Sequence, residues 1–194
     1  MKKILILTVL LALSGCYYKE GIRNTETGLF QTTFEPDIKL NEPFDLDKRK
    51  QLIFVEVISS QYPEADMTTH IEHYTKQLKR INYFDEFLNY EELQIALINN
   101  DLSEQIPSLK GKIAVSNAAK LYKPFLWLTI DLTPPDADVI GTYRLTFVDP
   151  LSLKELLIVE TTPGFWWGMT PEAMQFPMFN ALIQYIRENS KSYI

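Results

Sequence analysis

Cysteine, histidine and long apolar runs are scarce in this 194-residue chain, and each shortage excludes a class of protein. The chain has one cysteine, so no disulfide forms within it and the fold must be stable through packing. No apolar run reaches the ~20 residues that a membrane-spanning helix needs. No serine lies in the G-x-S-x-G pattern of a hydrolase nucleophile, and no internal repeat is present.

The charge balance narrows the possible partners. The chain has 19 lysine and arginine residues against 25 aspartate and glutamate residues, a formal net charge of −6. Residues 1–15 contain two of the lysines and no acidic residue, so a mature chain without them carries a charge of −8. Such an acidic surface disfavours binding to nucleic acid and electrostatic binding to anionic lipid.

The first fifteen residues, MKKILILTVLLALSG, have the pattern of a secretory signal peptide. Lys2 and Lys3 give a positive start, an apolar segment runs from Ile4 to Leu13, and small residues follow. A buried amino-terminal strand or helix is the alternative. It is disfavoured because no polar face interrupts the run.

The single cysteine, Cys16, follows this segment directly. The stretch LALSGC closely resembles the lipoprotein box of bacterial lipoproteins. That resemblance implies cleavage before Cys16, a diacylglycerol joined to its sulfur, and acylation of the new amino terminus by a fatty acid such as palmitate. Two or more buried chains, at ~0.8 kcal/mol per CH2, anchor a protein durably. Tyr17 at the next position implies sorting to the periplasmic face of the outer membrane, if the source is Gram-negative.

The rest of the chain divides into a tether over 16–49 and one globular domain over 50–194. The tether mixes glycine, proline and polar residues without periodicity. Its scattered aromatic residues, such as Phe30 and Phe44, leave open that parts of it lie on the domain as an extended arm.

The first half of the domain alternates strands and helices. The apolar, β-branched segment 51–60, with Glu56 as its exception, predicts a strand inside a sheet. Residues 68–81 predict an amphipathic helix in which Thr69 and Glu72 form a capping box. A short strand over 82–89 follows, and then a helix over 90–102 that Asn89 caps. A further helical turn or two is expected over 116–122.

The second half changes to the two-residue period of strands. Alternation over 124–134 and 141–150, followed by 151–162, predicts two or three antiparallel strands, with a turn at Asp149 to Ser152. A closing helix follows Thr170, and Pro177 should either begin the helix proper or kink it. The order β-α-β-α-β-β-β-α predicts an α/β (α+β) fold, a single mixed sheet with helices packed on it.

This order, with the stretches INYFDEFLNYEEL and FVDPLSLKELLIVE, resembles a group of bacterial envelope proteins. The group includes the penicillin-binding-protein activator lipoproteins, the curli secretion lipoprotein and the amino-terminal domain of the Tol–Pal translocation protein. A D-P-x-(S/T)-x-x-x-L turn, found here from Asp149 to Leu156, is part of the likeness. The resemblance implies a periplasmic binding domain without catalysis, and it carries over no functional residue.

Candidate catalytic and metal-binding residues are few. His70 and His73 lie three apart on a predicted helix, whereas zinc helices usually present histidines four apart and need a third ligand. Glycosidase chemistry needs two carboxylates across a cleft, and sequence neighbours alone do not establish one; the pairs are Asp136 and Asp138, Glu91 and Glu92, and Asp45 and Asp47. We expect no enzyme activity, no metal, and no cofactor beyond the covalent lipid on Cys16.

The most distinctive segment is PGFWWGM, residues 163–169. Phe165, Trp166 and Trp167 either seal the core beneath the last helix or form an exposed contact surface, as tryptophan does at binding hot spots and membrane interfaces. Adjacent residues of an extended chain point to opposite sides, so we expect that the two tryptophans are not both buried.

These features favour a non-enzymatic lipoprotein whose domain binds a protein partner in an envelope assembly. One alternative is a structural or self-assembling subunit of a secretion complex. A hydrolase of envelope polymers is a further alternative, although no catalytic constellation supports it.

Overall fold

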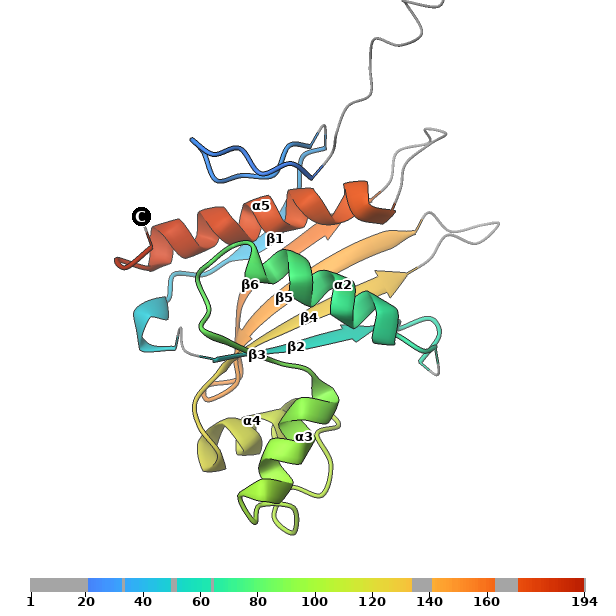
Figure 1. Ribbon diagram of the computed structural model, residues 1–194, viewed down its shortest axis with the longest axis vertical. Helices are drawn as coiled ribbons and strands as arrows, with labels where there is room; N and C mark the ends of the chain where they lie inside the picture. The colour runs from blue at the N-terminus through green and yellow to red at the C-terminus, as the bar shows by residue number, and fades with distance from the viewer. Residues whose placement is uncertain are drawn as a thin grey trace, which may run out of the picture.

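The computed structural model describes residues 21–32, 34–49, 52–63, 65–133, 141–162 and 171–193. Six strands and four α-helices form an α+β domain (Figure 1). In chain order the elements are β1 (Asp37–Asn41), the 3-10 turn η1 (Leu46–Lys48), β2 (Leu52–Ile58), α2 (Thr68–Lys79), β3 (Glu86–Leu88), α3 (Tyr90–Asn99), α4 (Lys112–Leu121), β4 (Leu126–Thr133), β5 (Thr142–Asp149), β6 (Lys154–Thr161) and α5 (Pro171–Asn189).

The six strands form one mixed sheet in the order β1-β6-β5-β4-β2-β3. The four strands β1, β6, β5 and β4 run antiparallel to their neighbours, whereas β2 is parallel to both β4 and β3. The predicted single mixed sheet is therefore confirmed, and β2 lies inside it as expected. The predicted order of elements matches only roughly, because it omitted the edge strand β1.

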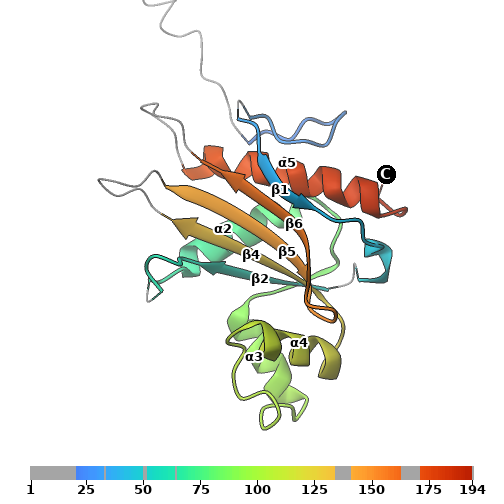
Figure 2. The same ribbon diagram turned by 180° about the vertical axis from the view of Figure 1, so that it is seen from behind.

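The helices are divided between the two faces of the sheet. Helices α2 and α5 lie across one face, and the largest hydrophobic cluster fills the space between them and the strands (Figure 1). Helices α3 and α4 form a lobe at one end of the molecule, with a smaller cluster against Leu52, Phe54 and Trp127 (Figure 2). The rest of this second face carries no helix.

The alternation predicted for the second half is confirmed. Leu126, Leu128 and Ile130 of β4 are buried in the large cluster. In β5, Leu145 and Phe147 are buried on the same face. Helix α5 presents the predicted buried stripe of Phe179, Leu182, Ile183 and Ile186. It begins at Pro171, so Pro177 lies within the helix and does not start it.

The two predicted helix caps have different outcomes. Asn89 forms a complete capping box at α3: its Oδ1 accepts from the backbone N of Glu92 at 2.9 Å, and the carboxylate of Glu92 accepts from the backbone N of Asn89 at 2.8 Å. The capping box predicted for Thr69 is wrong. Helix α2 begins one residue earlier, and the Oδ1 of Asp66 accepts from the backbone N of Thr68 at 2.9 Å. A carboxylate two residues upstream thus takes the place of the threonine hydroxyl.

The described part of the segment expected as a tether packs on the domain. Residues 21–31, here called the amino-terminal hairpin, fold back on themselves through hydrogen bonds such as that from the backbone N of Gln31 to the carbonyl of Ile22, at 2.8 Å. Phe30 is buried and stacks on Phe176 of α5, with 5.0 Å between ring centroids. Asn180 of α5 both donates to and accepts from the backbone of Phe30. The extended-arm alternative therefore describes these residues.

Candidate functional site

Several predicted site residues lie outside the described residues. Cys16 precedes the first described residue, Gly21, and the segment with Phe165, Trp166 and Trp167 falls between β6 and α5. Asp136 and Asp138 fall between β4 and β5. The lipidation site and the aromatic contact therefore stay predictions.

The two histidines do not come together as a metal site. His70 is exposed, whereas the Nε2 atom of His73 lies 2.9 Å from the Oε1 atom of Gln175, which is fully buried at the start of α5. Within the described ranges, no group of three or more histidine, cysteine, aspartate or glutamate side chains is placed to hold a metal ion. His73 joins α2 to α5, which is a structural role.

The carboxylate pairs that lie within the described residues have structural partners. Glu92 completes the cap of α3, and Asp45 forms an ion pair with Lys48 at 3.0 Å. Asp47 accepts hydrogen bonds from the hydroxyls of Ser190 and Ser192, at 2.5 and 2.6 Å. These hydrogen bonds hold the pKa of the Asp47 carboxyl well below its usual range. Neither pair faces its partner across a cleft.

A pocket of about 570 Å³ opens between the amino-terminal hairpin and the end of α5. Two positively charged side chains line it, Arg23 from the hairpin and Arg187 from α5, with a single carboxylate, Glu26. Asn82 and Tyr193 add polar groups from the turn after α2 and from the carboxyl-terminal end. The pocket thus collects donors from four segments that are distant in sequence.

Arg23 is held by neutral acceptors. Its Nε atom donates to the carbonyl of Gly28 at 2.6 Å, and its Nη2 atom donates to the hydroxyl of Tyr193 at 3.0 Å. Its Nη1 atom donates to the carbonyl of Arg80. In this way Arg23 ties the hairpin to the end of α2 and to the carboxyl-terminal segment, while its positive charge has no carboxylate partner within the described residues.

Arg80 and Arg187 hold the same hairpin in the same way. Arg80 donates to the carbonyl of Gly21 at 2.8 Å and lies over the ring of Phe30. Arg187 is exposed and donates to the carbonyl of Thr27 at 2.5 Å. For both, as for Arg23, no ion pair with a carboxylate is found in the described part of the chain. Three guanidinium groups therefore surround the hairpin of an otherwise acidic protein.

The uncovered part of the second sheet face is polar, and Glu56 is its most enclosed carboxylate. Trp127 donates from its indole N–H to Glu56 at 3.2 Å. Burial raises the pKa of the Glu56 carboxyl, and the indole hydrogen bond opposes this in part. Along the same face, Arg144 of β5 pairs with Glu160 of β6 at 3.5 Å. This face carries both charges, with threonines between them.

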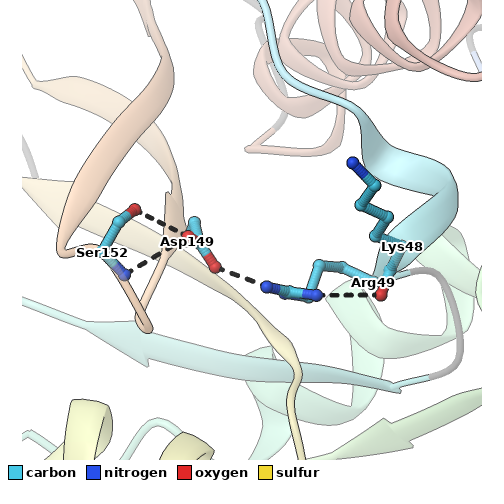
Figure 3. Close-up of polar contacts among 4 residues, drawn as sticks. All are labelled: Lys48, Arg49, Asp149 and Ser152. Atoms are coloured by element: carbon cyan, nitrogen blue, oxygen red, sulfur yellow. Dashed lines mark hydrogen bonds and ion pairs between the residues drawn. The ribbon is translucent and has the colours of Figure 1, made fainter.

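A buried carboxylate stands at the end of β5 (Figure 3). Asp149 is 3% exposed, and its Oδ2 atom accepts from the hydroxyl of Ser152 at 2.6 Å, which confirms the predicted turn. Its Oδ1 atom lies 3.7 Å from the Nε atom of Arg49, just before β2. The pair joins the end of the amino-terminal segment to the β5–β6 hairpin.

The lobe of α3 and α4 exposes several large apolar side chains. Ile95 and Ile98 lie three apart on α3, and Ile113 and Leu121 lie on α4. Each helix turns other apolar residues, such as Leu97 and Val115, into the smaller cluster. The lobe and the amino-terminal hairpin lie at opposite ends of the long axis of the molecule (Figure 1).

Sequence reasoning missed the arginine-lined pocket because its members are spread along the chain. Arg23 belongs to the segment expected as a tether, and Arg187 lies near the end of the last helix. No spacing rule relates positions so far apart. The available signal was the aromatic content of the tether, which indicated contact with the domain but not the contact surface.

No protein-family model matches the sequence, and no curated protein matches it. Among solved structures, the LpoB C-terminal domain from Escherichia coli is 12% identical, covering 59% of this chain and 83% of its own, with a TM-score of 0.41. Lipoprotein GNA1162 from Neisseria meningitidis is 10% identical, covering 75% and 99%, with a TM-score of 0.42. A PelC dodecamer from Paraburkholderia phytofirmans is 10% identical, covering 79% and 97%, with a TM-score of 0.38.

The resemblance predicted from the sequence thus has counterparts of low identity among solved structures, and they include a lipoprotein. With every reported TM-score at 0.42 or below, the likeness carries no argument about function or site residues. Among the helices built from described residues, none combines the length and apolar character that crossing a membrane requires.

Proposed function

We propose that this protein is a non-enzymatic bacterial envelope lipoprotein, anchored by lipid on Cys16, whose domain binds a protein partner. The observation that carries the proposal is the order of residues 1–16: two lysines, an apolar run, small residues and then the only cysteine of the chain. Acyl chains on that cysteine hold an acidic domain at a bilayer that its net charge would not attract. The proposed location is the periplasmic face of the outer membrane.

The described domain is compatible with this arrangement. It begins at Gly21, five residues after Cys16, and its hydrophobic clusters are complete without a disulfide. A thiol at Cys16 therefore has no structural duty within the described domain. That leaves it free for the lipid.

Metabolic labelling with a fatty-acid analogue tests the anchor. The wild-type protein should incorporate the label and fractionate with membranes, whereas Cys16→Ser should do neither. Incorporation into Cys16→Ser, or a purified native protein whose first residue is not an acylated cysteine, would overturn the proposal.

The partner contact is assigned to the segment with Phe165, Trp166 and Trp167, because clustered aromatic residues are the side chains that dominate binding hot spots. Cross-linking in intact cells, followed by identification of the captured protein, should yield one main partner. Trp166→Ala or Trp167→Ala should weaken that capture while the melting temperature stays nearly unchanged. If capture and melting temperature fall together, the segment belongs to the core. A large oligomer of the chain itself, seen by light scattering, would favour the self-assembling subunit.

A further inference from the structure

The anchor and the domain are joined by a very short leash. Four residues, 17–20, separate Cys16 from Gly21. A fully extended chain spans at most ~3.6 Å per residue, so the Cα atoms of Cys16 and Gly21 are at most about 18 Å apart. This step rests on the proposed lipidation of Cys16. Under it, the domain stays beside the bilayer, because residues 21–49 do not act as a long spacer.

The structure also fixes which surface meets the bilayer first. The backbone N–H of Gly21 donates to the carbonyl of Gln31 at 3.2 Å, and its carbonyl accepts from Arg80. A side chain at position 21 would collide with the ring of Phe176, because a Cβ atom there would lie 2.3 Å from that ring. With a φ of +79°, the position also favours glycine. The chain therefore enters the domain at a tightly packed point beside the arginine-lined pocket.

We propose that the pocket between the amino-terminal hairpin and α5 binds a phosphate group of the membrane lipids, and that this contact turns the hairpin toward the bilayer. Arg187 carries most of the free donors, since its one hydrogen bond within the described residues goes to Thr27. Arg23 adds a second positive charge that no described carboxylate pairs with. Guanidinium groups fit phosphate oxygens in charge and in geometry.

Two further features of the surface suit a lipid headgroup better than a free anion. Ile22, at the start of the hairpin, is 45% exposed and can enter the apolar edge of the interface. The opposing carboxylate of Glu26 limits the net charge of the pocket, so phosphate alone is held weakly. A bilayer compensates for this, because the leash keeps many phosphates within reach of one pocket.

The consequence is a defined orientation. The hairpin faces the membrane, and the lobe of α3 and α4 points away from it, because the two lie at opposite ends of the long axis (Figure 2). The exposed Ile113 and its apolar neighbours then lie where the lipid does not reach.

Vesicle co-sedimentation of residues 16–194 carrying Cys16→Ser tests the pocket without the anchor. The chain should bind vesicles of phosphatidylglycerol and phosphatidylethanolamine more strongly than vesicles of phosphatidylcholine, and salt should weaken the binding. Arg187→Gln should lower the binding constant about fivefold, the effect of one basic residue near an anionic surface. Arg187→Lys should retain most of it. The matched control is Arg144→Gln, which removes the same charge from the uncovered sheet face and should change little.

The outcomes separate this proposal from the anchor. Equal losses in Arg187→Gln and Arg144→Gln, or no preference for anionic vesicles, overturn the pocket even if Cys16 is acylated. If titration shows that inorganic phosphate binds the chain while vesicles do not, the lipid assignment is overturned. Fatty-acid labelling tests the anchor alone and does not depend on Arg187.

A second measurement tests the orientation in the lipidated protein. Acylation occupies the thiol of the only native cysteine, so one introduced cysteine can carry a fluorophore alone. A fluorophore at Thr25→Cys, in the hairpin, should be quenched by lipids with a nitroxide headgroup. A fluorophore at Ile113→Cys, on the lobe, should not. Equal quenching at both sites, or stronger quenching at the lobe, would overturn the orientation.

Discussion

One face of the sheet is covered from end to end by α2 and α5, whereas the other is covered only at one end, by α3 and α4 (Figures 1 and 2). The same strands supply both faces through their alternation. Strand β4 sends Leu126, Leu128 and Ile130 into the large cluster, and Trp127, Thr129 and Asp131 to the other side. The comparison teaches that stability is concentrated on the covered face, while the uncovered part is polar enough to remain in water.

The largest expected effect is a truncation in the middle of the covered face. Phe179 is fully buried in α5 and touches the rings of Phe30 and Tyr74. Phe179→Ala should lower the free energy of unfolding by about 3–5 kcal/mol, because it removes apolar burial and leaves a cavity. Urea denaturation followed by circular dichroism measures this loss.

The control for this prediction lies on the lobe. Ile113 is 73% exposed, so Ile113→Ala should change the free energy of unfolding by no more than about 0.5 kcal/mol. If the two substitutions cost similar amounts, the division between a stabilising face and a dispensable surface is wrong.

The next largest effect should come from the end of β5, where a bulge after Phe147 interrupts the alternation between the two faces. Asp149→Ala removes the acceptor of the Ser152 turn and leaves Arg49 without its carboxylate. We expect a loss of about 2–3 kcal/mol in the free energy of unfolding, somewhat less than for a fully buried pair, because Arg49 is partly exposed.

Asp149→Asn separates the two contributions. It keeps an oxygen for the hydroxyl of Ser152 and removes the charge that faces Arg49. Its loss in the same urea experiment should be smaller than that of alanine. Equal losses would mean that the charge alone matters and that the turn contributes little.

The covered face was predictable from the sequence because its information is local and periodic. The alternation in β4 and β5 and the stripe of α5 place Leu128, Phe147 and Leu182 in the core with no knowledge of distant contacts. The capping box of Asn89 was also readable, since its partner Glu92 lies three residues away.

The features that the sequence did not reveal depend on distant partners. Strand β1 is short and mostly exposed, and it is a strand because β6 offers it a free edge. The pocket needs Arg23 and Arg187 to meet through the folding of the whole domain. The cap of α2 failed because two competing local acceptors, Thr69 and Asp66, lie near the same helix start, and pattern alone does not rank them.

The lobe under the second face offers a smaller test. Asn89→Ala removes the side-chain half of the α3 capping box and should lower the free energy of unfolding by about 1 kcal/mol. Thr69→Ala is the matched control at α2, where the threonine makes no cap, and should cost less than half as much. Hydrogen exchange should show the loss from Asn89→Ala first at the amides of α3. A larger loss from Thr69→Ala would restore the predicted cap.

The smallest expected effect concerns the uncovered face and has a distinct dependence on pH. The pKa of Glu56 is raised in the folded protein by burial, so the folded state binds this proton more tightly than the unfolded state does. Ionised Glu56 therefore destabilises the fold at pH 7. That penalty disappears as the pH falls below the ordinary pKa of a glutamate, about 4.3.

Glu56→Gln should accordingly raise the free energy of unfolding at pH 7 by less than about 1 kcal/mol, because the amide oxygen still accepts from Trp127 and no charge is enclosed. The gain should shrink toward zero near pH 4 when urea denaturation is repeated across the range. Glu72→Gln, exposed on α2, controls for the removal of one negative charge from an acidic protein. A gain of the same size at every pH, or a loss at pH 7, would show that the ionised carboxylate is well solvated. The uncovered face would then be open to water even beside Trp127, where the lobe of α3 and α4 begins.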